Sequence, residues 1–254
     1  MRYVSFASGS SGNCGLLQGG GVSLLVDAGI SMKRIKGCLA DEGLELGDLN
    51  GILVTHEHSD HVSGLAMLSK YTALPMYMSG GTARAVRRQI RCREESLRTI
   101  EAGVPFSLGE LRVTAFETSH DAVQPFGFRV DGETGILVVV TDLGYVSRSV
   151  REAVKGCTAA VVEANYDLDM LRSGPYPQNL KRRIVGNYGH LDNLDAAEFC
   201  ACLAENGVKR LLLAHLSKEN NLPGLAQETV DRRLNGEIPV RVAPRDGRSD
   251  ELEI

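Results

Sequence analysis

Apolar and polar positions alternate along the chain in short blocks, which predict many strands and fewer helices. Runs of about four to eight apolar, β-branched or aromatic residues between turn-forming residues indicate strands. We expect strands at residues 1–6, 22–29, 51–55, 75–78, 104–108, 111–116, 126–130, 135–140, 159–163, 210–214 and 240–243. We expect helices at residues 31–42, 62–71, 80–93, 146–154, 193–206 and 223–235. Residues 174–183 read as a polar, proline-bearing loop, and the residues after 243 as a polar tail.

The chain has no internal repeat, low-complexity tract or linker, so we expect residues 1–254 to form one domain. Hydrophobic residues make up 43% and charged residues 24%, which is typical of globular proteins. The net charge of −4 excludes a polycation, so any nucleic-acid binding must depend on a local basic patch or on metal ions.

Cysteine usage and the absence of a leader segment both bear on the compartment. The six cysteines are scattered and form no Cys-x-x-Cys pair, which indicates reduced thiols and not a secreted disulfide framework. The N-terminus begins directly with a predicted strand, and no apolar run is long enough to span a bilayer. We therefore expect a cytoplasmic protein without a membrane segment.

The most informative stretch directly follows the predicted strand at 51–55. It reads His56-Glu57-His58-Ser59-Asp60-His61 and contains three of the six histidines of the chain. Folding alone does not gather histidines so tightly, whereas neutral imidazole and carboxylate are the usual ligands of zinc and similar divalent ions. The stretch therefore predicts a metal site, with a solvated turn as the weaker alternative.

A His-x-His-x-Asp-His motif after a buried strand resembles the signature of the metallo-β-lactamase fold family. The resemblance covers essentially the whole chain and implies an α/β protein, an αββα sandwich of two mixed β-sheets flanked by helices. It also implies two bound metal ions. His120, Asp142 and His215 match the later ligands of the family, and each follows an apolar, strand-like run. Asp27, at the end of another predicted strand, would brace the metal-binding loop without binding metal.

The family pattern distributes these residues over two metal positions. His56, His58 and His120 would hold the first ion; Asp60, His61 and His215 would hold the second; Asp142 would bridge both. An Asp at position 142, where zinc β-lactamases of one subclass have Cys, resembles hydrolases of thioesters and phosphodiesters. Oxygen donors make Mn²⁺ as plausible as Zn²⁺, with Mg²⁺ or Ni²⁺ as further candidates. Two ions about 3.5–4 Å apart lower the pKa of a shared water to give a bridging hydroxide, and Asp60 would orient that water or take its proton.

Three further segments narrow the resemblance to the YycJ/WalJ branch of this family, whose members are thought to be 5′-to-3′ exodeoxyribonucleases. They are the Gly/Ser loop at 8–13, the Gly-His-Leu-Asp-Asn segment around His190, and the Leu-Ser-Lys segment after His215. The resemblance implies DNA with 5′-phosphorylated ends as the partner. A pocket for that phosphate would use Ser8, Ser10, Ser11, Asn13, His190 and Lys218. His190 would bind the phosphate or protonate a leaving group.

Several alternatives stay open at this level. The loop at 8–13 also reads as a plain hairpin turn, and the arginines of the predicted helix at 80–93 read as a solvated face as well as a phosphate track. The same ligands would serve a small-molecule hydrolase of thioesters, lactones or cyclic nucleotides. A regulatory module keeping its metals is disfavoured by the complete ligand set. The segment between Asp142 and His215 is filled by predicted elements, so an inserted β-CASP cap domain would not fit.

Overall fold

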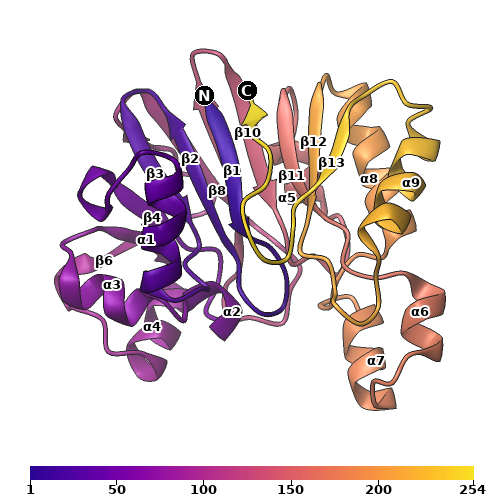
Figure 1. Ribbon diagram of the computed structural model, residues 1–254, viewed down its shortest axis with the longest axis horizontal. Helices are drawn as coiled ribbons and strands as arrows, with labels where there is room; N and C mark the ends of the chain where they lie inside the picture. Colours follow the sequence, from indigo (N-terminus) through magenta and orange to yellow (C-terminus); the bar gives the residue numbers. More distant parts are fainter.

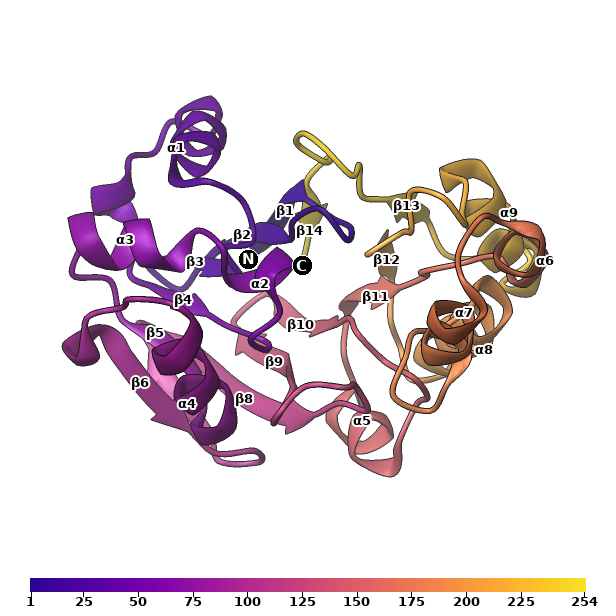
Figure 2. The ribbon, with the colours of Figure 1, turned by 90° about the horizontal axis from the view of Figure 1, so that it is seen from below.

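Two seven-stranded β-sheets pack face to face, and helices cover both outer faces (Figures 1 and 2). The computed structural model describes residues 1–254. The first sheet has the order β14-β1-β2-β3-β4-β5-β6, with β1 Arg2–Ala7, β2 Cys14–Gly19, β3 Val22–Val26, β4 Gly51–Leu53, β5 Met76–Ser79, β6 Leu97–Ile100 and β14 Leu252–Glu253. The second has the order β13-β12-β11-β10-β9-β8-β7, with β7 Phe106–Leu108, β8 Leu111–Glu117, β9 Phe126–Gly132, β10 Gly135–Val140, β11 Ala159–Glu163, β12 Arg210–Ala214 and β13 Val240–Val242.

The helices divide between the two outer faces and the end of the sandwich. They are α1 Met32–Asp41, α2 Ser59–Val62, α3 Leu65–Tyr71, α4 Gly80–Gln89, α5 Arg148–Ala153, α6 Leu168–Ser173, α7 Gln178–Val185, α8 Asn193–Glu205 and α9 Pro223–Arg233. In Figure 2, α1, α3 and α4 flank the first sheet, while α5, α8 and α9 flank the second. The predicted αββα sandwich is therefore confirmed. None of these helices combines the length and the apolar character that crossing a bilayer requires.

The central strands, such as β3 and β10, are apolar on both faces because they are buried on both sides. Successive side chains of a strand point to opposite faces. In β3, Leu24 packs between the two sheets, whereas Leu25 packs outward under the helices. In β10, Leu137 points into the space between the sheets and Val138 packs against the helical layer of the second sheet. Continuous apolar runs, and not alternating ones, are the expected result.

Parallel pairing brings the ends of the functional strands to one edge of the sandwich. β3 pairs parallel with β4, and β10, β11 and β12 pair parallel with one another. Their carboxyl ends meet at the lower edge in Figure 1, where α2 lies and beyond which α6 and α7 extend. The polar loops that follow these strands therefore lie together.

Two predicted helices differ from the observed ones for identifiable reasons. The helix expected at 62–71 is divided into α2 and α3 at Gly64, where a Cβ atom would lie 2.4 Å from the carbonyl oxygen of Ile30. The helix carrying the arginines ends at Gln89, so the prediction that Arg91 and Arg93 belong to it was wrong. Ile90 turns to an extended conformation there, and Ile90 and Cys92 pack against the core of the first sheet.

The prediction of a loop at 174–183 was also wrong. This region follows α6 and forms most of α7. Asp167 begins α6 by accepting a hydrogen bond from Met170 N at 2.9 Å. Both helices are short and largely polar, and they bury only a small cluster around Leu171 and Ile184. The expected polar tail likewise contains β14, which pairs with β1 through Arg2 and Glu253.

Candidate metal centre

The loop from Thr55 to His61 is held in place by one buried carboxylate. Asp27 accepts hydrogen bonds from Thr55 N at 2.8 Å and from Thr55 Oγ1 at 2.9 Å, and its Oδ2 lies 2.8 Å from His61 Nδ1. Since Nδ1 of His61 is used in this way, its Nε2 is the nitrogen that faces the other polar side chains. The prediction that Asp27 braces this loop is confirmed by these contacts.

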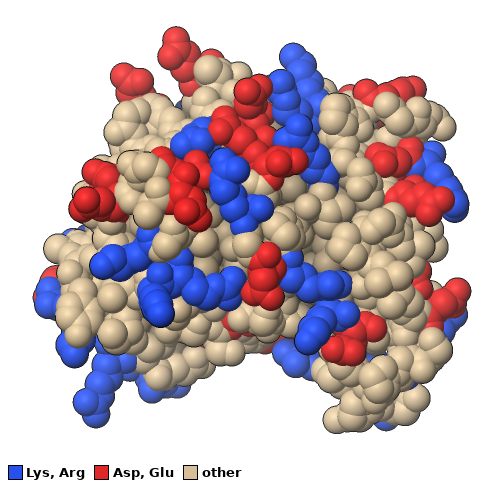
Figure 3. Space-filling model, viewed as in Figure 1, with Lys and Arg blue, Asp and Glu red and all other residues tan.

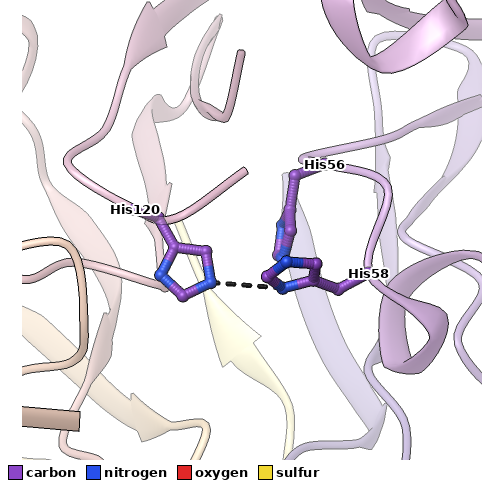
Figure 4. Close-up of side chains that lie close together, drawn as sticks. All are labelled: His56, His58 and His120. Atoms are coloured by element: carbon purple, nitrogen blue, oxygen red, sulfur yellow. Dashed lines mark hydrogen bonds between the residues drawn. The ribbon is translucent and has the colours of Figure 1, made fainter. Parts of the chain in front are cut away.

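Three histidines form the first group of donors. The nearest ring nitrogens of His56, His58 and His120 all lie within 4.8 Å of one another. Figure 4 shows His56 and His58 on one loop, opposite His120, whose Nε2 lies 3.3 Å from His58 Nδ1. His120 Nδ1 donates to the carbonyl oxygen of Gly189 at 3.0 Å, which fixes the ring with Nε2 toward the group. Such a set of imidazoles has the donor chemistry of a zinc-type site.

A second group lies beside the first and shares one carboxylate with it. Asp60 Oδ2 lies 3.4 Å from His61 Nε2 and 3.5 Å from His215 Nε2. Asp142 is placed between the groups: its Oδ2 lies 3.5 Å from His61 Nε2, and its Oδ1 lies 3.6 Å from His215 Nε2 and 3.7 Å from His120 Nε2. All seven residues predicted as ligands are thus brought together, and their role as ligands stays a prediction.

Backbone strain coincides with this arrangement. Four non-glycine residues have φ in the left-handed region, and three of them, Asp27, Asp142 and His215, belong to the site, with φ of 59°, 61° and 59°. Each follows the end of a strand, and the left-handed turn there redirects the side chain toward the centre. A left-handed non-glycine residue costs on the order of 1–3 kcal/mol and persists only where surrounding contacts enforce it, as is common at functional sites.

Burial and neighbouring charges divide the histidines into two electrostatic classes. Burial, together with the neighbouring histidines, holds the pKa of His56 well below its usual value, and burial also lowers the pKa of His120. Burial alone would lower the pKa of His61 as well, but Asp142, Asp27 and Asp60 outweigh it and raise the pKa well above its usual value. In His215 burial is likewise outweighed, chiefly by Asp142, and the pKa rises to about 10.

The residues fit a bound divalent ion because buried donor atoms at the centre lack partners. His56 Nε2, Asp142 Oδ2 and His215 Nε2 are fully buried and make no hydrogen bond. A buried polar atom without a partner costs about 1–3 kcal/mol, so three of them converging at one place need a common explanation. Cations bound in the two neighbouring donor groups, with Asp142 between them, would satisfy all three. Divalent metal binding is therefore the consistent interpretation of the cluster.

Sequence reasoning missed Glu163, the fully buried carboxylate at the end of β11. Its Oε1 accepts from His190 Nδ1 at 2.8 Å and lies 3.0 Å from His215 Nδ1, while its Oε2 accepts from the backbone N–H groups of Leu143 and Leu191. Burial opposes ionisation, but His190 and His215 outweigh it and lower the pKa of Glu163 to about 2. The sequence did contain an indication of this role, because Glu163 is the one charged residue of a strand that is otherwise apolar and buried.

The predicted phosphate residues are only partly brought together. A cavity of about 240 Å³ lies over the donor groups, and Ser10 and His190 line it. Ser8 and Asn13 are buried and already bonded: Ser8 Oγ accepts from His215 N at 2.7 Å, and Asn13 Nδ2 donates to Asp60 Oδ2 at 3.2 Å. Lys218 is exposed and does not line the cavity, and Ser11 is exposed as well.

Comparison with known proteins places the chain in a family. The beta-lactamase superfamily domain matches residues 23–216. Exodeoxyribonuclease YycJ from Bacillus anthracis is 38% identical over 235 residues, 92% of this chain and 89% of that protein. Exodeoxyribonuclease WalJ from Streptococcus pneumoniae is 38% identical over 237 residues, 92% of this chain and 88% of its own length. The Zn²⁺-bound crystal structure of PqqB from Methylobacterium extorquens has the same fold, with a TM-score of 0.72, 19% identity and complete coverage of both chains. The chain therefore belongs to the beta-lactamase superfamily and, within it, to the family of the exodeoxyribonucleases YycJ and WalJ.

Proposed function

We propose that the protein is an exodeoxyribonuclease that binds two divalent metal ions, Mn²⁺ or Zn²⁺, and removes nucleotides from 5′-phosphorylated DNA ends. The metal-dependent chemistry rests on the convergence of the unpartnered donor atoms of His56, Asp142 and His215. The DNA substrate rests on the identity with exodeoxyribonuclease YycJ along nearly the whole chain. We propose that residues 1–254 act as one domain, since only α5 to α8 and β11 lie between β10 and β12.

Bound metal ions would lower the pKa of a water molecule and offset the charge that develops on the phosphodiester oxygens. Asp60 would orient that water. Its carboxylate accepts from Asn13 Nδ2, and although burial opposes ionisation, His61 and His215 hold its pKa well below the usual value. A carboxylate with so low a pKa is a weak base, so it is better suited to positioning a water than to keeping its proton.

His190 would donate a proton to the leaving oxygen of the phosphodiester. Its Nδ1 is held by Glu163, so Nε2 remains for the cavity that His190 lines. Glu163 accepts from Nδ1 and so fixes the orientation of the ring, as a buried carboxylate does for a catalytic histidine. Protonation of the leaving oxygen from Nε2 is the role that this geometry favours.

The surface charge is consistent with DNA being bound by a few local contacts and not by the whole surface. On the face shown in Figure 3, basic side chains lie in a broken row across the middle, and acidic side chains interrupt it. With a net charge of −4, the protein as a whole does not attract a polyanion. Binding of DNA would therefore depend on the metal ions and on a few cations near the cavity.

The test is digestion of end-labelled single- and double-stranded DNA in the presence of Mn²⁺, comparing 5′-phosphate with 5′-hydroxyl ends. Asp142→Ala is the inactive control, and circular dichroism shows whether it remains folded. Release of mononucleotides from the 5′-phosphorylated strand is the expected result. Cleavage of a thioester or lactone with no action on either DNA would replace the nuclease by a small-molecule hydrolase.

A further inference from the structure

The cavity over the metal-binding residues contains one side chain that sequence reasoning never considered as a ligand for substrate. Arg183, on α7, is the only lysine or arginine among the residues that line this cavity. The other titratable residues lining it are Asp60, Asp121, Asp142, Tyr176 and four histidines, so Arg183 is the one side chain there that stays cationic whether or not the histidines bind metal. A phosphodiester entering this space meets three carboxylates and needs compensating positive charge.

The guanidinium of Arg183 is oriented by one specific contact. Its Nε donates to Asp121 Oδ2, while Asp121 Oδ1 lies 3.4 Å from His120 Nε2 and 3.9 Å from His58 Nε2. The carboxylate thus lies between the arginine and the first histidine group. The pair joins residues 62 positions apart in the sequence, so it forms only when α7 folds back over the end of the second sheet.

The remaining donors of Arg183 have no partner in the protein. Its only hydrogen bond uses Nε, so Nη1 and Nη2 are free. The side chain keeps 56% of its surface exposed, which leaves these donors accessible from solvent. A planar guanidinium held at Nε presents two parallel N–H groups on its other edge, and that edge matches two oxygens of a phosphate.

The wall around Arg183 favours a nucleotide over a bare anion. Tyr176, Leu180 and Ile184 line the same cavity from the α6–α7 region, so an aromatic and aliphatic surface lies next to the charged floor. Bases stack on aromatic side chains in a manner that tolerates any sequence. The cavity of about 240 Å³ is smaller than the roughly 300–1,000 Å³ typical of ligand pockets, which suits one terminal residue at a time.

We propose that Arg183, positioned by Asp121, binds a phosphate of the DNA strand through Nη1 and Nη2 and so takes the role expected of Lys218. This proposal rests on the proposed function, because it assigns the substrate of the same cavity. Asp121 is a positioning residue in this scheme. It holds the guanidinium toward the cavity and keeps it from closing on Asp60 and Asp142.

The experiment compares Arg183→Ala with Arg182→Ala, which removes the same charge from the neighbouring position of α7. Arg182 is exposed and does not line the cavity, and its Nε contacts only the carbonyl oxygen of Gln178 in its own helix. Four quantities are measured in the Mn²⁺-loaded proteins. They are KM and kcat for a p-nitrophenyl ester of thymidine 5′-phosphate, the salt dependence of binding to a fluorescent 5′-phosphorylated oligonucleotide, and the affinity for Mn²⁺.

We expect Arg183→Ala to raise KM and weaken oligonucleotide binding by about tenfold to a hundredfold, because a hydrogen bond to a charged group is lost. The slope of log K against log salt should become shallower by about 0.7, the value of one phosphate contact on a single strand. Arg182→Ala should leave the ester kinetics unchanged. Arg183→Lys should recover the slope but only part of the affinity, since it keeps the charge and loses the planar fork.

The two hypotheses fail in different ways. If Arg183→Ala leaves both KM and the salt slope at wild-type values, or if its only effect is weaker Mn²⁺ binding, the phosphate role of Arg183 is refuted while the nuclease assignment stands. If the wild-type protein cleaves the ester but no DNA, the nuclease assignment fails, and the KM ratio for the ester decides about Arg183. A wild-type protein that binds no oligonucleotide overturns both.

Discussion

The difference in pKa between the two groups of histidines predicts that metal binding releases protons. It also predicts that these protons come from His61 and His215. In the metal-free protein the pKa of His215 is raised to about 10 and that of His61 is also well above its usual value. Both are therefore protonated at pH 7, whereas His56 and His120, whose pKa values are lowered, are neutral. A metal ligand must be deprotonated, so His61 and His215 must each give up a proton.

The size of the effect follows from the distance between the pKa and the working pH. Removing the proton of His215 at pH 7 costs about 4 kcal/mol, because each of the three pH units corresponds to about 1.36 kcal/mol. We expect about two protons to be released when both metal positions fill at pH 7. The apparent affinity for the metals should then rise about a hundredfold per pH unit, because each proton contributes a factor of about ten.

Calorimetric titration with Mn²⁺ measures this directly when it is repeated in buffers of different ionisation enthalpy, since the difference in heat counts the protons. His215→Ala should reduce the count by about one. His120→Ala removes a ligand that is already neutral, so it should weaken binding without changing the count. A release of no protons in the wild-type protein would refute the electrostatic description of the second group.

The sign of the linked stability effect is fixed by the same argument. Because the folded pKa of His215 lies above its unfolded value of 6.5, its contribution to metal-free stability is complete below pH 6.5 and is lost as the pH rises toward 10. The metal-loaded protein does not carry that proton. The increase in melting temperature on adding metal should therefore grow between pH 6.5 and 10, which differential scanning fluorimetry can follow.

Three further predictions concern the scaffold. Glu163→Gln places an amide NH₂ opposite two N–H donors whichever way it is turned, so activity should fall and unfolding in urea should cost about 1–3 kcal/mol less. Since the folded pKa of Glu163 is about 2 and the unfolded value is 4.5, this advantage of the wild type should shrink as the pH falls from 4.5 to 2, and an unchanged difference would contradict it. Gly29→Ala would put a Cβ atom 1.6 Å from the carbonyl oxygen of Asp60 and should weaken Mn²⁺ binding, whereas Gly37→Ala in α1, with nothing within 4 Å, should stabilise the protein by up to about 1 kcal/mol. Phe128→Ala, buried between the sheets, should lower the free energy of unfolding by about 3–5 kcal/mol, and a loss below 1 kcal/mol would show that the core there is loose.

Sequence patterns predicted the fold well because the sandwich is built from runs that stay apolar on both faces. Several strands near the site read as one such run and end one to three residues before a polar functional side chain, as β10 does before Asp142. Strand-end positions of this kind are visible without knowing how strands pair. The motif at His56 to His61 is more local still, since it lies within six consecutive residues.

The parts that the sequence did not predict depend on contacts between distant segments. Residues 168–185 form helices of only six and eight residues that bury little, so each spans about two turns, and the prolines between them suggest a loop. The family resemblance implied that Ser8 and Asn13 bind phosphate, yet the fold uses both to hold His215 and Asp60. Left-handed backbone at Asp142 and His215 leaves no mark in sequence at all, since no glycine stands there.

Arg183 and Lys218 show how position outweighs residue type at this site. Lys218 follows β12 by four residues, and Arg183 lies on α7, the second helix after β11. Both carry a positive charge suited to binding phosphate. Lys218 is exposed and does not line the cavity. Arg183 lies on α7, which lines the cavity, and a carboxylate 62 residues away holds its Nε so that two donors remain free. A cation recognises substrate where the fold both aims it and leaves it unpaired. Only α7 provides those two conditions together.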